Sequence, residues 1–151
     1  PGAHLSQTEQ QELVRKIKTY LTNLTTDQVA EGVQKYSEIG IQSIIVYCPI
    51  DNRDIFQVDK VAGKLITMIN TEHVFWHSVI EPLEEKGDHD LLASIELLLS
   101  ALSRAKKEAS DKDQEVIHEY LTSKARHVKH LLNTKQKQSS STSDDAIEED
   151  D

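Results

Sequence analysis

The chain has few of the residues that mark secreted or membrane proteins. It contains a single cysteine, Cys48, which cannot form an internal disulfide, so nothing indicates an oxidising compartment. No run of about 18 apolar residues is present, so we expect no membrane-spanning helix. Residues 1–6 lack the basic and apolar stretches of a signal peptide. These absences predict a cytoplasmic protein, with the nucleus as the alternative location.

Glycine is equally scarce, and this excludes the common phosphate-cradling loops. The five glycines stand apart from one another, whereas both the P-loop and the dinucleotide-binding loop need glycines close together. Cys48 ends an apolar run before Pro49, which is typical of a buried, inert thiol and not of an activated nucleophile. The predicted loops are short and leave little chain for an active-site wall. We therefore predict that the protein is not an enzyme, with no catalytic residue and no cofactor.

Metal ligands occur only in incomplete sets. His73, His77 and Glu81 follow one another at a spacing of four, which would align three zinc ligands along a helix. This set lacks a fourth ligand and falls at the polar edge of the expected helix, so a solvated flank explains it. His127 and His130 stand among lysines and arginines, which disfavour a further cation. We predict no metal site.

What the chain does have is apolar residues at helical spacing. Its 151 residues suit one domain. Ser6 and Glu9 form the pattern of a capping box, and Asp88 precedes the strongest apolar stripe. Asp51 and Asp54 are expected as a cap and a first-turn acid. The pattern predicts helices over residues 6–24, 25–39, 41–48, 51–69, 71–82, 88–102 and 111–136. In the strongest stripe we expect burial of Leu91, Leu92, Ile95, Leu98, Leu99 and Leu102.

The segment Ile41–Cys48 is the ambiguous element. Its β-branched residues suit a buried strand. A strand needs a partner, however, and the sequence offers no second strand-like run, so a short buried helix is the preferred interpretation. Pro82 should end or kink the helix expected over residues 71–82.

Together these elements predict an all-α fold of six to seven short amphipathic helices. Short connections place successive helices side by side, either in an irregular bundle or in a short stack of the HEAT or armadillo kind. Residues 6–136 form the expected helical domain. Residues 1–5 are expected to be disordered or derived from cloning. Because the chain lacks an initiator Met, we expect either a cloning remnant at this end or a fragment excised from a longer protein. Residues 137–151 are rich in Ser, Thr and acids and are expected to be a disordered acidic tail.

Charge is distributed unevenly at the C-terminal end. The net charge is −9, and six of the acids lie within the last eight residues. Lys124, Arg126 and Lys129 precede them in a stretch that contains no acid. A basic helix of this kind contacts nucleic acid or an acidic partner, although cations near a helix C-terminus also complement its dipole. No aromatic residue alternates with the basic ones to stack on nucleobases.

Two functions are compatible with these patterns. The first is a non-enzymatic adaptor or scaffold domain that binds a partner peptide or helix in an inter-helix groove. Tyr20, Trp76 and Tyr120 are its candidate contact residues, since Trp and Tyr dominate many interfaces, although ordinary core packing also explains them. The alternative is a nucleic-acid- or chromatin-associated factor that uses Lys124, Arg126 and Lys129. No membrane partner is expected, and the oligomeric state stays open.

The tail carries a pattern favoured by acid-directed kinases. Ser141 and Thr142 each have an aspartate three residues downstream, so both are candidate phosphorylation sites. Each phosphate would add about −1.5 to −2 charge. We expect such a charge to draw the tail toward the basic end of the last helix.

Overall fold

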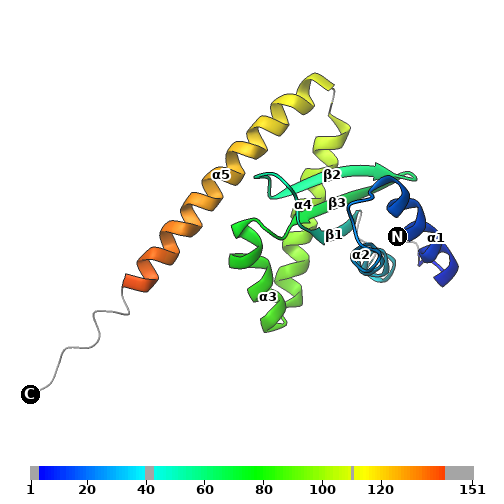
Figure 1. Ribbon diagram of the computed structural model, residues 1–151, viewed down its shortest axis with the longest axis horizontal. Coiled ribbons are helices and arrows are strands. Elements are labelled where there is room, and N and C mark those ends of the chain that lie inside the picture. The colour runs from blue at the N-terminus through cyan, green and yellow to red at the C-terminus, as the bar shows by residue number, and fades with distance from the viewer. Residues whose placement is uncertain (1–3, 40–42, 110, 142–151) are drawn as a thin grey trace, which may run out of the picture.

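The protein folds as an α+β domain and not as the expected all-α bundle or stack. The computed structural model describes residues 4–39, 43–109 and 111–141. Within them, five α-helices and one short π-helical turn surround a three-stranded sheet (Figure 1). The elements are α1 (Gln7–Tyr20), α2 (Thr26–Ile39), β1 (Ile44–Cys48), β2 (Phe56–Val61), β3 (Lys64–Asn70), η1 (Trp76–Ile80), α3 (Glu81–Lys86), α4 (His89–Glu108) and α5 (Asp111–Ser141).

A β-hairpin replaces the helix predicted over residues 51–69. β2 and β3 pair antiparallel, from Phe56 opposite Ile69 to Val61 opposite Lys64. The turn between them is Ala62–Gly63, with φ of 51° and 74°. Positive φ at both central residues defines the type I′ turn, whose twist matches that of the two strands. The prediction was wrong because the two central turn residues include only one glycine, and alanine rarely adopts this conformation.

β1 is a strand, which corrects the preferred helical interpretation of residues 41–48. β1 pairs in parallel with β3, so the strand order is β1-β3-β2. The partner of β1 was missed because β3 shows no alternation of buried and exposed residues. Ile66 to Asn70 are all buried, since helices cover both faces of the central strand. A strand covered on both faces loses the period of two that identifies a strand in sequence.

Helices α1 and α2 cover one face of the sheet. Ser6 caps α1 with the predicted capping box, and α1 buries Leu13 and Ile17. α2 lies directly on β1: a Cβ added to Gly32 would stand 2.5 Å from the carbonyl oxygen of Ile45, so only glycine permits this approach. The core on this face contains Leu13, Ile17, Leu24, Val29, Val33, Ile44, Val46, Cys48, Ile50, Val61, Ile66 and Met68.

Helix α4 covers the opposite face, with a buried side different from the one predicted. Asp88 caps the helix as expected, and its carboxylate accepts a hydrogen bond from the Leu91 amide. The helix buries Leu92, Glu96, Leu99, Ser100 and Ser103. By contrast, Leu91, Leu98 and Leu102 of the predicted stripe are exposed. The buried serines pair with two hydroxyls: Ser43, just before β1, donates to Ser100 over 2.6 Å, and Thr67 of β3 donates to Ser103 over 3.0 Å.

An ion pair closes the outer edge of β1. Lys35 Nζ on α2 lies 2.5 Å from Glu96 Oε1 on α4, and the Tyr47 hydroxyl of β1 donates to the same oxygen. Glu96 is fully buried, and burial together with Glu96 raises the pKa of Tyr47 far above its ordinary value. Trp76 packs against the Tyr47 ring, with centroids 4.8 Å apart. This cluster joins α2, β1 and α4 at one edge of the sheet.

The C-terminal part of the chain turns back over the sheet. Pro82 does not end its helix: it lies in the first turn of α3, directly after the widened turn η1. α5 follows α4 and runs diagonally away from it past the ends of the strands (Figure 1). Its helical conformation continues to Ser141, beyond the expected end at Gln136. Among the described helices, none is long and apolar enough to cross a membrane.

Candidate functional site

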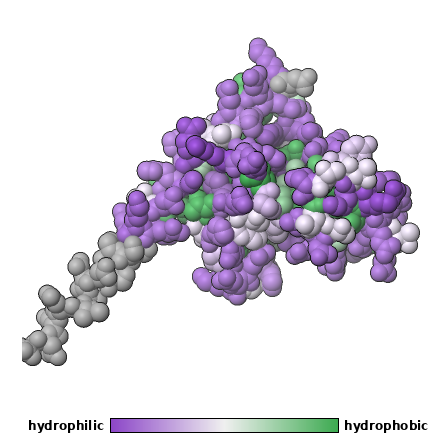
Figure 2. Space-filling view, in the orientation of Figure 1, coloured by the Kyte–Doolittle hydropathy of each residue, from purple (hydrophilic) through white to green (hydrophobic). Residues whose placement is uncertain are grey.

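A polar cleft of about 640 Å³ lies between α5 and the carboxyl ends of the parallel strands β1 and β3. Ligands of open α/β sheets commonly bind at this end of the strands. The face in Figure 2 is largely hydrophilic, with apolar residues emerging in small patches over the sheet and beside α5. The lining residues of the cleft are Asn52, Arg53, Asn70, Glu72, His73, Val74, His77, Ala125, Arg126, Lys129, His130, Asn133 and Gln136.

Asn70 holds the two loops that form one wall of the cleft. Its Oδ1 accepts hydrogen bonds from the amides of Ile50 (3.1 Å) and Glu72 (3.0 Å). Its Nδ2 donates to the carbonyl oxygens of Asp54 (3.0 Å) and Asn52 (3.3 Å). Because the side chain is buried and fully bonded, it fixes the β1–β2 loop against the end of β3. The loop that carries Arg53 is thereby positioned by a residue of the central strand.

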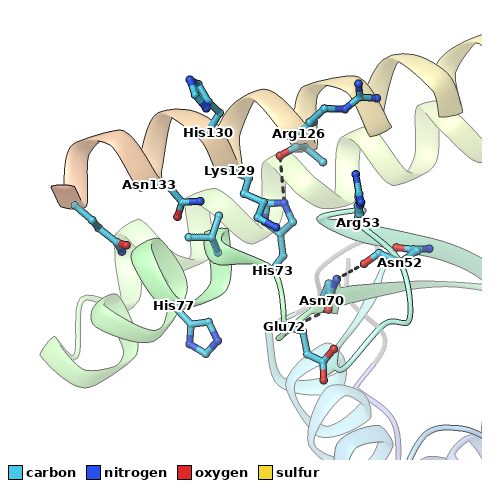
Figure 3. Close-up of a pocket in the computed structure, with 13 residues that line it drawn as sticks. Asn52, Arg53, Asn70, Glu72, His73, His77, Arg126, Lys129, His130 and Asn133 are labelled. Atoms are coloured by element: carbon cyan, nitrogen blue, oxygen red, sulfur yellow. Dashed lines mark hydrogen bonds between the residues drawn. The ribbon is translucent and has the colours of Figure 1, made fainter.

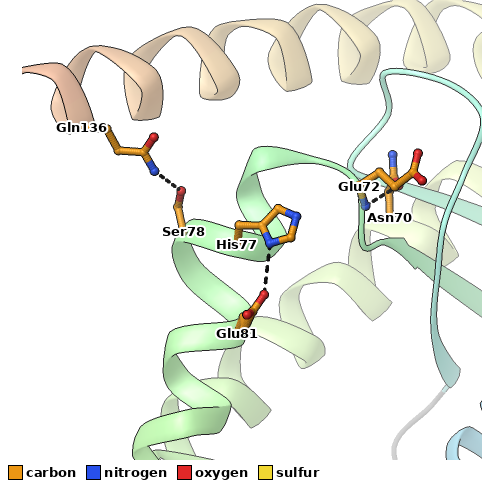
Figure 4. Close-up of polar contacts among 6 residues, drawn as sticks. All are labelled: Asn70, Glu72, His77, Ser78, Glu81 and Gln136. Carbon is orange, nitrogen blue, oxygen red and sulfur yellow. Dashed lines mark hydrogen bonds and ion pairs between the residues drawn. The ribbon is translucent and has the colours of Figure 1, made fainter.

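Three polar contacts hold α5 over this wall. Thr122 Oγ1 donates to Asp54 Oδ1 over 2.8 Å, so the buried Asp54 anchors α5 and does not serve as the predicted first-turn acid of a helix. His73 Nε2 lies 3.2 Å from the Ala125 carbonyl oxygen, and Ala125 is buried. Farther along, Gln136 Nε2 donates to Ser78 Oγ over 3.2 Å (Figure 4). Helix α5 therefore covers the cleft, and polar contacts hold it at both ends of the cleft.

His73 is buried between η1 and α5, and its bonding fixes the tautomer. The Phe75 amide donates to Nδ1 over 3.0 Å, so Nδ1 is unprotonated and Nε2 carries the proton donated to Ala125. Burial lowers the pKa of His73 from its ordinary value, and the nearby Lys129 lowers it further, against the opposing effects of Ala125 and Asp54. The neutral ring is thus the form that fits the folded structure. The solvated position predicted for His73 was wrong.

Cations dominate the charge of the cleft. Arg53, Arg126 and Lys129 line it together with one acid, Glu72. The four ion pairs found among the described residues involve none of these three cations. In Figure 3, Arg53 rises from the β1–β2 loop toward α5, Lys129 and Asn133 descend from α5, and His130 points away from the body. The cleft therefore presents positive charge from two elements distant in sequence, which suits an anion.

The candidate metal ligands do not converge. His77 Nδ1 and Glu81 Oε2 lie 3.0 Å apart and pair on the exposed side of η1 and α3 (Figure 4). His73 precedes this helix and bonds to α5 instead. Within the part of the chain that the structure describes, no three His, Cys, Asp or Glu side chains are grouped to hold a metal ion. Cys48 is buried and free, and burial raises its pKa to about 11.

The predicted contact residues lie in different places. Tyr20 is 75% exposed at the end of α1, and Tyr120 is 58% exposed on α5, where Lys124 Nζ lies 5.0 Å from its ring centroid. Trp76 packs into the core on the α4 face of the sheet. Of the predicted basic residues, Arg126 and Lys129 line the cleft, whereas Lys124 does not.

A second hollow, of about 680 Å³, lies between two neighbouring helices. It lies between α1 and α2, over Val14 and Ala30. Glutamines dominate its rim, and its two cations are Arg15 and Lys18. Lys18 donates to the Leu24 carbonyl oxygen and caps its own helix. Because the Lys18 side chain bonds to the backbone of Leu24, the groove has fewer cations available to a ligand than the cleft has. The cleft is therefore the stronger candidate site.

Arg53 and Asn70 line the candidate site although the sequence did not indicate them, and His73 stood out in the sequence only as a possible zinc ligand. No spacing pattern connects them with α5, because a strand and two loops bring them there. Of the two candidate phosphorylation sites, Ser141 is the last residue of α5 and Thr142 lies outside the described residues, so their modification stays a prediction. No family model matches the chain, and no curated protein or solved structure is significantly similar to it.

Proposed function

We propose that this domain is a non-enzymatic adaptor that binds an acidic segment of a partner protein in the cleft beneath α5. The observation that carries the proposal is the presence of Arg53, Arg126 and Lys129 in one cleft without an ion pair among the described residues. Exposed arginines and lysines that converge without carboxylate partners favour an anionic ligand. A cytoplasmic or nuclear location belongs to the same proposal.

The chemistry of the lining favours binding over catalysis. A general base needs an available nitrogen or carboxylate near the reacting group. Both ring nitrogens of His73 are bonded to the backbone, and His77 is paired with Glu81. The remaining lining side chains are mainly amides and cations, together with one carboxylate, Glu72, and His130, which points away from the body (Figure 3). These groups bind and orient an anion more readily than they transfer a proton.

A protein segment fits the cleft better than a nucleic acid does. None of the 13 lining residues is Phe, Tyr or Trp, so the cleft offers no platform for base stacking. The chain as a whole carries a charge of −9, which disfavours the extended phosphate backbone of a polynucleotide. A short acidic peptide places its charges within the cleft alone and avoids the rest of the acidic surface.

The test is binding of a fluorescein-labelled peptide in which aspartates alternate with glycines, followed by fluorescence anisotropy. The variant Arg53→Gln/Arg126→Gln/Lys129→Gln removes the three cleft cations. Each exposed charge pair contributes under about 1 kcal/mol, so the triple variant should lose roughly 10- to 100-fold in affinity. The matched control Lys60→Gln/Lys86→Gln/Lys112→Gln changes the net charge equally at exposed positions outside the cleft and should retain binding.

Two results would contradict the proposal. Equal losses in both triple variants would mean that the peptide responds to net charge and not to the cleft. A single-stranded oligonucleotide that displaces the peptide and binds more tightly would make the domain a nucleic-acid-binding protein. Salt dependence does not separate these ligands, because both are anions, so direct competition is the necessary measurement.

A further inference from the structure

The net charge of the cleft indicates which kind of anionic group fits it. Three cations and one acid leave a formal charge of two positive units on its lining. A serine or threonine phosphate carries about −1.5 to −2 charge at neutral pH, so a single phosphate balances the cleft. An aspartate or glutamate side chain carries one negative charge, and two of them would have to be ordered to achieve the same balance.

The arrangement of the cations also favours one doubly charged group. Arg53 comes from the loop after β1, and Lys129 comes from α5 on the opposite side of the cleft (Figure 3). Three phosphate oxygens accept hydrogen bonds in different directions, so one group can contact donors from two walls. The planar guanidinium of an arginine can bind two of these oxygens at once.

The neutral residues around the cations suit a peptide on either side of the phosphate. Asn133 points from α5 into the space below, and Asn52 lies on the same loop as Arg53 (Figure 3). Amide side chains of this kind donate to and accept from peptide backbone groups. His73 stays neutral through its bonds to Phe75 and Ala125, so it supplies a fixed wall and not a competing cation.

We infer that the acidic segment bound by the cleft carries a phosphorylated serine or threonine, with its phosphate between Arg53 and Lys129. This inference rests on the proposed function and specifies its ligand. The phosphate is the group that distinguishes the partner, and flanking acids add attraction at the rim of the cleft.

The experiment compares two labelled peptides that differ at one position, phosphoserine in one and glutamate in the other. By anisotropy at pH 7.5, the phosphopeptide should bind at least about tenfold more tightly. The ratio of the two affinities is then followed to a pH of about 5.5. It should fall toward one, because the second ionisation of phosphate has a pKa of about 6 whereas that of glutamate is near 4.

Both peptides face the same ionisable groups of the cleft, His73, Glu72 and His77 on one wall and His130 on α5, so comparing the two affinities reduces the contribution of these groups. Variant Lys129→Gln should reduce the ratio, whereas Lys124→Gln should leave it unchanged. Lys124 is a matched control, because it lies on the same helix but stacks on Tyr120 outside the cleft.

The outcomes separate the inference from the proposed function. Equal affinities of the two peptides, with loss of both in the cleft variants, would overturn the phosphate inference and leave an acidic-peptide module. A tenfold preference that survives in Lys129→Gln would place the phosphate elsewhere and would also overturn it. Absence of binding by either peptide would overturn the proposed function as well.

Discussion

The His73 side chain is a residue at which the structure depends on protonation. Its Nδ1 accepts from the Phe75 amide, and this bond is lost when Nδ1 takes up a proton. Burial and Lys129 lower the pKa of the folded state below the ordinary value of 6.5. Above that value the ring is neutral in both states. As pH falls through it, the unfolded chain binds the proton first, so the folded state loses stability.

We therefore predict that the free energy of unfolding decreases between pH 7.5 and 5.5, and that His73→Gln reduces this decrease. Urea denaturation at several pH values measures it. His127→Gln is the control, since His127 is exposed on α5, and it should leave the pH dependence unchanged. A decrease of the same size in His73→Gln would show that other groups cause it.

The Lys35–Glu96 pair provides a second prediction at the residue scale. Glu96 is completely buried, and its Oε2 has no hydrogen-bond partner among the described residues, whereas the Lys35 side chain is 30% exposed. Removing the lysine leaves a buried, unbalanced carboxylate, which costs about 3–5 kcal/mol. Removing the carboxylate leaves a lysine that can turn toward water. Lys35→Met should therefore destabilise the protein more than Glu96→Gln does.

The double variant Lys35→Met/Glu96→Leu completes this comparison. It removes both charges, so much of the stability lost in Lys35→Met should return. Urea titration of the three variants and the parent protein gives the coupling. A double variant that is less stable than Lys35→Met would show that the pair contributes through packing, and the electrostatic explanation would fail.

At the scale of single elements, α4 offers a matched pair of leucines. Leu99 is 6% exposed and packs with Ile45, Phe56 and Ile69, whereas Leu98 is 60% exposed. Leu99→Ala should cost about 2–5 kcal/mol, the usual range for a buried leucine. Leu98→Ala should cost under about 0.5 kcal/mol, the usual limit for surface positions. Denaturant titration of both variants tests the observed orientation of α4, and equal costs would contradict it.

The helices were predictable where they carry their own local signals. Ser6 and Glu9 cap α1, and Asp88 caps α4, because capping depends only on residues a few positions apart. The strands were not predictable, because each of β1 and β3 can be recognised as a strand only when the other is known to be its pairing partner. Once β3 was interpreted as helix, the apolar run at Ile44–Cys48 had no partner, so one error produced the second.

The candidate site was predictable only on its α5 side. Arg126 and Lys129 belong to a visible run of basic residues, so the sequence indicated them. Arg53 comes from the β1–β2 loop, which Asn70 ties to the end of β3 and which meets α5 through the bond from Thr122 to Asp54. Contacts of this kind depend on the sheet register, which the sequence did not disclose. Because the strands were not predicted, the side of the site that the β1–β2 loop carries was not predicted either.

At the scale of the whole molecule, stability should be unequal between the sheet and α5. β3 is central and is covered on both faces, whereas in the described part of α5, residues 112–138, Ala125 is the single buried residue. Regions with few buried contacts open without global unfolding. We predict that native-state hydrogen exchange is slowest for β3 amides and faster for α5 amides beyond Ala125. Equal protection of the two segments would contradict this difference.

The parallel pairing of β1 with β3 also has a kinetic consequence. Partners in the β2–β3 hairpin begin three positions apart, at Val61 and Lys64, whereas Ile44 and Ile66 are separated by 22 positions. Closing the longer loop costs more chain entropy, so the hairpin has the advantage in forming early. Until β1 arrives, the apolar edge of β3 is open to other chains, and unpaired edges promote aggregation. The yield of refolding should therefore depend on protein concentration more than the stability of the finished fold does.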